Sequence, residues 1–273
     1  MMITIYTITG SAVYAAEIPV SDQDQLITSR DWTEISNLQD EMKKEEPDAT
    51  IDYDKALKVY VDCNLIKLQT ADTKKLTSAL ESANYVWVIP FKMEKTYGMF
   101  TVAKGLPLSE EAKSVLTKAE QEEVKNHAGK WMITETAEHT VEPYYDILLE
   151  KREALSDCTR VVLVGSQPGM RQPVALGMDD ETARIWISLG YQYPVMEKIP
   201  ETQNVESGVY SFDSVAEISD TYIEDSEVST GAGVQSRSSM KYVAGIGIIV
   251  IGSILILSVL KKKKLEQSGD MSR

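Results

Sequence analysis

The chain has 273 residues, 43% of them hydrophobic and 26% charged, and its formal net charge is −14. So acidic a chain repels phosphate backbones, which makes nucleic acid a poor partner. The hydrophobic content suffices for one folded domain with its own core. No residues have the spacing of a redox, zinc or phosphate-loop motif, so we predict no cofactor and no metal.

Residues 1–15 are apolar and uncharged and end in small side chains, the pattern of a secretory signal peptide cleaved before Ala16. The basic start of such a peptide is missing, and the alternation from Ile3 to Ile5 also fits a half-buried strand. We expect the signal peptide, and a start upstream of Met1 would explain the missing basic segment.

Residues 16–196 are predicted to form an exported α+β domain. In its first half, Asp31 can cap a helix that ends at Pro47, and Asp72 can cap a second helix with an apolar stripe. Runs of β-branched and aromatic residues predict strands at 55–63, 85–91 and 99–103, the last two as a hairpin.

In the second half, Ser109 can cap a third helix, which is expected to bury one side and to end at Gly129. A fourth helix is expected with Pro143 in its first turn. Further strands are predicted at 130–136, 160–164, 173–177 and 183–189, with a Pro-Gly turn at 167–169 inside a hairpin.

The two halves share an order of elements, because strand, helix and hairpin occur over 55–105 and again over 130–189. This order predicts an antiparallel sheet with helices packed on one face. Either two related strand–helix–hairpin units or one irregular α+β domain would give it.

The C-terminal part changes in composition. Residues 197–240 are rich in Ser, Thr, Gly, Glu and Asp and show no apolar period, so we predict a flexible stalk. The stretch 242–260 has no charged residue. At about 1.5 Å per residue, a helix of that length spans close to the ~30 Å hydrocarbon layer of a bilayer. Residues 241–260 are therefore assigned to a transmembrane helix that lies in membrane lipid.

The orientation of this helix follows from four residues at its end, Lys261, Lys262, Lys263 and Lys264. Lysines concentrate on the cytoplasmic side of a membrane helix. Five basic and two acidic residues leave the tail 261–273 at +3 and the rest of the chain at −17. The sequence thus predicts a single-pass protein with a basic cytoplasmic tail and an extracellular N-terminal domain. The glycines of the helix lack a small residue four positions away, so oligomerisation through it is not expected.

Stalk, apolar helix and basic tail together resemble the sorting signal of Gram-positive wall-anchored surface proteins, which implies a bacterial surface protein. The sortase pentapeptide Leu-Pro-any-Thr-Gly is missing, and residues 227–231 keep only its Thr-Gly. We therefore favour a permanent membrane anchor, with a degenerate sorting signal as the alternative.

Four aromatic residues form the candidate binding surface, namely Trp87, Trp186, Tyr191 and Tyr193. If exposed, they make a platform for sugar rings or a partner protein, and if buried they belong to the core.

Cysteine and histidine usage limits the chemistry. Cys63 and Cys158 either pair as a disulfide in an oxidising compartment or stay buried and free. The chain has two histidines and lacks the H-E-x-x-H and G-x-S-x-G signatures. The sequence favours a non-catalytic binding or sensing module for an extracellular protein or wall glycan. The alternative is a membrane-tethered hydrolase with an Asp/Glu pair, since such pairs leave no sequence signature.

Overall fold

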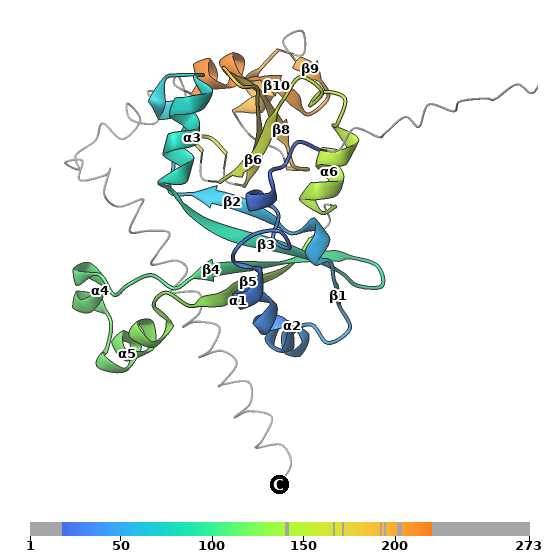
Figure 1. The fold of residues 1–273 in the computed structure, drawn as a ribbon. Coiled ribbons are helices and arrows are strands. Elements are labelled where there is room, and N and C mark those ends of the chain that lie inside the picture. Colours follow the sequence, from blue (N-terminus) through green and yellow to red (C-terminus); the bar gives the residue numbers. More distant parts are fainter. Residues whose placement is uncertain are drawn as a thin grey trace, which may run out of the picture.

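The structure, a computed structural model, describes residues 18–139, 142–165, 167–170, 172–191, 193, 195–200 and 204–219 (Figure 1). The strands are β1 (Thr50–Ile51), β2 (Leu57–Val61), β3 (Asn84–Lys92), β4 (Tyr97–Lys104), β5 (Trp131–His139), β6 (Arg160–Val164), β7 (Val174–Met178), β8 (Ala183–Ser188), β9 (Asn204–Glu206) and β10 (Val209–Ser211). The α-helices are α1 (Trp32–Ile35), α2 (Gln39–Glu45), α3 (Thr73–Glu81), α4 (Glu110–Val115), α5 (Lys118–His127) and α6 (Tyr144–Glu150).

All ten strands belong to one sheet with the order β5-β4-β3-β2-β6-β7-β8-β10-β9, and β1 pairs with β3. Among the described strands, β2 and β6 form the one parallel pair. This pair joins two antiparallel meanders, because the chain returns from the edge strand β5 through α6 to the middle of the sheet, a crossover that a parallel pair requires. The prediction of an α+β domain with a mostly antiparallel sheet is confirmed.

The two strand–helix–hairpin units of the sequence analysis are placed differently in the sheet. In the first, β2 lies directly beside its hairpin β3–β4. In the second, β5 lies at the sheet edge on β4, and its hairpin β6–β7 starts in the middle. The shared order of elements therefore does not correspond to a shared arrangement.

Helices cover both faces of the sheet, so the prediction that they pack on one face is wrong. Leu76 and Leu80 of α3 share a hydrophobic cluster with Val162, whereas Leu148 of α6 shares another with Val161. Because neighbouring residues of a strand point to opposite faces, α3 and α6 lie on opposite sides of β6. The uninterrupted apolar run of this strand suits burial on both sides.

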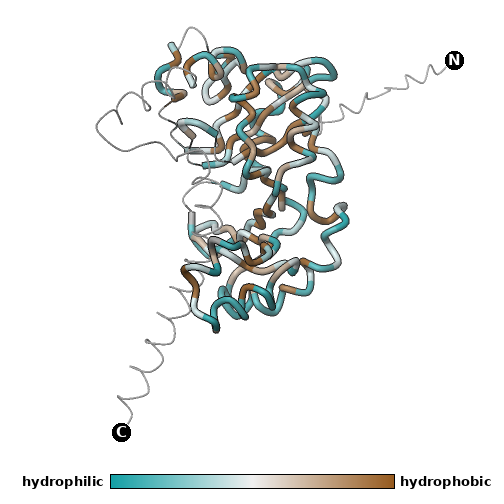
Figure 2. The backbone as a smooth tube through the Cα atoms, turned by 90° about the vertical axis from the view of Figure 1, so that its left-hand side faces the viewer, coloured by the Kyte–Doolittle hydropathy of each residue, from teal (hydrophilic) through white to brown (hydrophobic). Residues whose placement is uncertain are grey.

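A third hydrophobic cluster lies on the same face as α3. It joins Ile35 and Met42 of the N-terminal helices to Trp87 and Phe91 of β3, and Tyr85 packs against both this cluster and that of α3. The helical spacing read from 32 to 42 in the sequence is thus confirmed as the continuous stretch of α1, a 3-10 turn and α2. Hydrophobic segments follow the inner strands of the domain, and hydrophilic segments lie mainly at its periphery (Figure 2).

Several local predictions are confirmed at the level of single residues. The Asp72 side chain caps α3 by accepting a hydrogen bond from the backbone N–H of Lys75 at 3.0 Å. Gly169 has a φ of +73° in the turn between β6 and β7, a conformation that glycine adopts without strain. Pro143 directly precedes α6.

The predicted third helix is two helices. α4 ends at Val115, and Thr117 begins α5 with a capping box in which its side chain and that of Glu120 bond each other's backbone N–H. Val115, expected on the buried side, is 72% exposed. α4 and α5 lie away from the sheet, between the ends of β4 and β5 (Figure 1).

The folded domain extends beyond the predicted stalk boundary at residue 197. β10 pairs with β8, and a helix follows at 212–219. Phe212 stacks on Trp186 with 5.6 Å between ring centroids, and Val215 is completely buried. The apolar residues of this segment stand singly among polar ones, which is why their composition indicated a stalk.

Five predicted features fall outside the described residues. These are the signal peptide at 1–15, the rest of the stalk at 220–240, the degenerate sorting signal at 227–231 within it, the transmembrane helix at 241–260 and the basic tail at 261–273. Within the described part of the chain, no helix has the length and apolar character needed to cross a membrane. The membrane anchor stays a prediction from the sequence.

Candidate functional site

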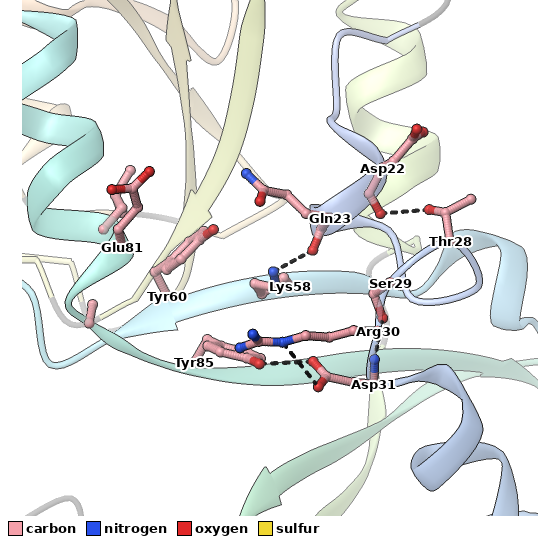
Figure 3. A pocket seen from close by; sticks show the side chains of 12 residues that line it. Asp22, Gln23, Thr28, Ser29, Arg30, Asp31, Lys58, Tyr60, Glu81 and Tyr85 are labelled. Carbon is pink, nitrogen blue, oxygen red and sulfur yellow. Dashed lines mark hydrogen bonds and ion pairs between the residues drawn. The ribbon is translucent and has the colours of Figure 1, made fainter.

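A pocket of about 440 Å³ opens on the sheet face where the α3 cluster meets the α1–α2 cluster (Figure 3). Its lining comes from the segment 22–31, from β2 and β3, and from the C-terminal end of α3. Polar and charged side chains dominate this lining, in contrast to the apolar clusters on either side.

Lys58 of β2 forms the floor of the pocket and is only 8% exposed. Its Nζ lies 3.4 Å from Oδ1 of Asp24 and donates a hydrogen bond to the backbone carbonyl of Gln23. The same Nζ lies 4.7 Å from the ring centroid of Tyr85 and 5.3 Å from that of Trp87, within the range of cation–π attraction. Burial nevertheless outweighs the attraction of Asp24 and lowers the pKa of Lys58.

Asp24 is the buried counter-ion and is 2% exposed. Its carboxylate accepts hydrogen bonds from the Ser21 hydroxyl at 2.6 Å, the Tyr60 hydroxyl at 2.7 Å and Nη2 of Arg160 at 3.1 Å. Burial alone would raise the pKa of Asp24, but the hydrogen bonds from Ser21 and Tyr60 and the charges of Arg160 and Lys58 together lower it. Asp24 is therefore a carboxylate at neutral pH, and all its neighbours are donors.

Asp31 has a different role from the one predicted. It occupies the N-cap position of α1 without a side-chain cap hydrogen bond. Instead, its buried Oδ2 accepts hydrogen bonds from the Tyr85 hydroxyl at 2.9 Å and from Nε1 of Trp87 at 3.1 Å. The carboxylate thereby connects the start of α1 to β3 and provides a partner for a tryptophan N–H inside the core.

The rim of the pocket carries charges that are exposed. The Arg30 side chain is 86% exposed, and its Nε lies 3.9 Å from Oδ1 of Asp31. Contact with the Tyr85 hydroxyl raises the pKa of Arg30. Asp22 and Glu81 are also exposed, and neither carboxylate forms an ion pair within the described residues.

The sequence-predicted aromatic surface is not formed by its tryptophans. Trp87 and Trp186 are completely buried in different clusters, and Tyr193 is 2% exposed. Tyr191 is half-buried, and its ring centroid lies 6.5 Å from that of Tyr193. The two tryptophans lie on the inner strands β3 and β8, and the two tyrosines lie in the connection after β8. All four belong to the hydrophobic clusters or pack against them.

The two cysteines are free thiols on opposite faces of the sheet, so the predicted alternative of a disulfide is wrong. Cys63 packs against the α3 cluster, and Cys158 belongs to the α6 cluster. Burial raises the pKa of each thiol to about 11. Neither thiol is therefore a reactive nucleophile at neutral pH.

The buried network around Lys58 was not predicted from the sequence. One local signal existed, a lysine inside the apolar strand LKVYV. The partners Asp24 and Arg160 are 136 residues apart and carry no shared pattern. In the described ranges no set of His, Cys, Asp or Glu side chains is grouped to hold a metal ion.

The geometry of the pocket is the basis for a functional assignment, since comparisons of the chain with protein-family models, with curated proteins and with solved structures found no match.

Proposed function

We propose that the chain is a single-pass, membrane-anchored cell-surface protein whose extracellular domain is a non-catalytic binding module with its ligand site in the pocket over Lys58. The uncharged stretch 242–260 and the lysines that follow it support the membrane anchor. The observation that carries the binding role is the division of charge in the pocket. Its deep charged groups are bonded to one another, whereas its rim charges face solvent.

The deep groups suit structure better than catalysis. A general acid needs a proton at working pH, and the lowered pKa of Asp24 leaves it ionised. The carbonyl and the carboxylate that hold Lys58 both favour its ammonium form, which has no lone pair for nucleophilic attack. Asp31 already accepts two hydrogen bonds from Tyr85 and Trp87. These arrangements argue against a hydrolase that uses Asp24 or Asp31.

The rim groups are suited to binding. Arg30 offers an exposed planar guanidinium, and Tyr85 offers a half-buried ring and a hydroxyl beside it. The lining also includes the apolar side chains of Leu80 and Ala83, so the pocket combines nonpolar contact with polar groups, as small-molecule sites do.

The test uses the full chain in mild detergent, immobilised and exposed to pools of small molecules from culture medium and from solubilised cell wall. The expected result is a pool component that the wild type retains unchanged in mass and that Arg30→Ala does not retain. Conversion of a component to a product of different mass would establish the hydrolase instead. If no component distinguishes the wild type from Arg30→Ala, the pocket is not the ligand site.

A further inference from the structure

The charges around the pocket rim identify the chemical class of its ligand, on the basis of the binding role proposed above. One exposed guanidinium and two exposed carboxylates line the pocket, those of Arg30, Asp22 and Glu81. From this arrangement we infer that the pocket binds a small zwitterion, an amino acid or a short peptide with free amino and carboxyl ends.

The anionic end of the ligand pairs with Arg30. A guanidinium presents two parallel N–H donors that match the two oxygens of a carboxylate. In Arg30 only Nε is near a protein carboxylate, at 3.9 Å, and the 86% exposure of the side chain leaves the rest of the guanidinium open to a ligand. Asp31 and Tyr85 hold the guanidinium beside the pocket (Figure 3).

The cationic end of the ligand pairs with Glu81. Glu81 is the last residue of α3, where the helix dipole adds negative potential to that of the side chain. Asp22, from the segment 22–31, carries a second exposed carboxylate, which points away from the guanidinium of Arg30 (Figure 3). These two carboxylates also disfavour a ligand that carries only negative charge, because they would repel it.

The size and the apolar part of the lining complete the match. Leu80, Ala83 and the Tyr85 ring provide nonpolar contact for the side chain of the ligand. The volume of about 440 Å³ lies in the lower part of the range of small-molecule pockets, roughly 300–1,000 Å³. An amino acid or dipeptide fits within such a volume, whereas a long oligosaccharide or an extended peptide does not.

The experiment is a calorimetric titration of the full chain in mild detergent with four named probes. Leucine and the dipeptide Ala-Leu carry both charges, N-acetyl-leucine lacks the ammonium group, and leucinamide lacks the carboxylate. We expect the two zwitterions to bind and each blocked analogue to bind at least about tenfold more weakly, since each loses a charge-assisted hydrogen bond.

Two substitutions assign each ligand end to its residue. Arg30→Ala should weaken leucine and N-acetyl-leucine by about tenfold and leave leucinamide unchanged. Glu81→Gln should weaken leucine and leucinamide and leave N-acetyl-leucine unchanged. Matched controls are Arg152→Ala, two residues after α6 on the opposite face, and Glu122→Gln on α5, and both should bind like the wild type. Arg30 and Glu81 are exposed, so an unchanged denaturation midpoint will show that the variants fold.

The remaining outcomes separate the ligand class from the binding role. A pool component without both charges that binds in an Arg30-dependent way would overturn the zwitterion and leave the pocket as a binding site. Failure of both zwitterions to bind the folded wild type would overturn the inference as well. Equal binding of leucine and its two blocked analogues would show that the rim charges do not recognise the ligand.

Discussion

Removing the buried carboxylate of Asp24 should be among the most damaging single changes in this domain. Asp24→Ala deletes the acceptor of three hydrogen bonds and leaves two cations, the buried Lys58 and the half-buried Arg160, without their counter-ion. Breaking a buried ion pair from one side costs about 3–5 kcal/mol. We therefore expect the free energy of unfolding of Asp24→Ala to fall by about that amount.

Asp24→Asn isolates the charge, because the amide keeps one acceptor oxygen and nearly the same volume. We expect a loss of about 2 kcal/mol, the scale of a hydrogen bond to a charged group. The double variant Asp24→Asn/Lys58→Met should lose less unfolding free energy than the two single variants lose together. The reason is that Lys58→Met removes the cation that Asp24→Asn leaves unpaired. The exposed Asp48→Asn is the matched control and should stay within about 0.5 kcal/mol of the wild type.

The assay is urea denaturation of the full chain in mild detergent, followed by tryptophan fluorescence over a range of pH. The folded pKa of Asp24 is below its unfolded value of about 3.9, so its stabilisation is complete above that pH and is lost as the pH falls through the folded pKa. The difference between wild type and Asp24→Asn should therefore shrink in acid. If Asp24→Asn unfolds like Asp48→Asn at neutral pH, the reasoning about this network is refuted.

Three further changes test other parts of the fold. Trp186→Ala removes a completely buried ring that stacks on Phe212, so unfolding free energy should fall by about 3–5 kcal/mol, and an unchanged urea midpoint would contradict this packing. Thr117→Ala removes the capping box of α5 and should weaken that helix locally by about 1 kcal/mol. Amide hydrogen exchange should then accelerate within α5 while the global midpoint stays constant, and a shifted midpoint would show that α5 supports the core. Cys63 and Cys158 should react with maleimide rapidly only after unfolding, because both thiols have a pKa of about 11, and a mass two hydrogens short before reduction would reveal a disulfide.

Local sequence patterns predicted the elements that depend on local interactions. The cap at Asp72, the Pro-Gly turn before β7 and the apolar runs of β3 and β6 need only neighbouring residues to be recognised. The break at Thr117 was not predicted. The apolar spacing on both sides of it indicated one continuous helix, although Thr117 and Glu120 form the capping box that starts a second one.

Features that depend on tertiary contacts could not be predicted in this way. α6 belongs to the crossover that makes β2 and β6 parallel, and no local pattern encodes which face of the sheet this crossover covers. Asp31 looks like a helix cap in the sequence and becomes a buried acceptor because β3 brings Tyr85 and Trp87 to it. The site is the hardest part to predict, since Asp24 and Arg160 are 136 residues apart and meet only in the tertiary fold.

The most direct test of the account is labelling of intact cells with a membrane-impermeant maleimide. Thr28→Cys places a thiol on the exposed wall of the pocket, and Lys262→Cys places one in the predicted cytoplasmic tail, each in a background with both native cysteines replaced. The account predicts that Thr28→Cys is labelled on intact cells, that the ligand retained by the wild-type chain slows this labelling, and that Lys262→Cys is labelled only after permeabilisation. Labelling of Lys262→Cys but not Thr28→Cys on intact cells would contradict the extracellular binding module.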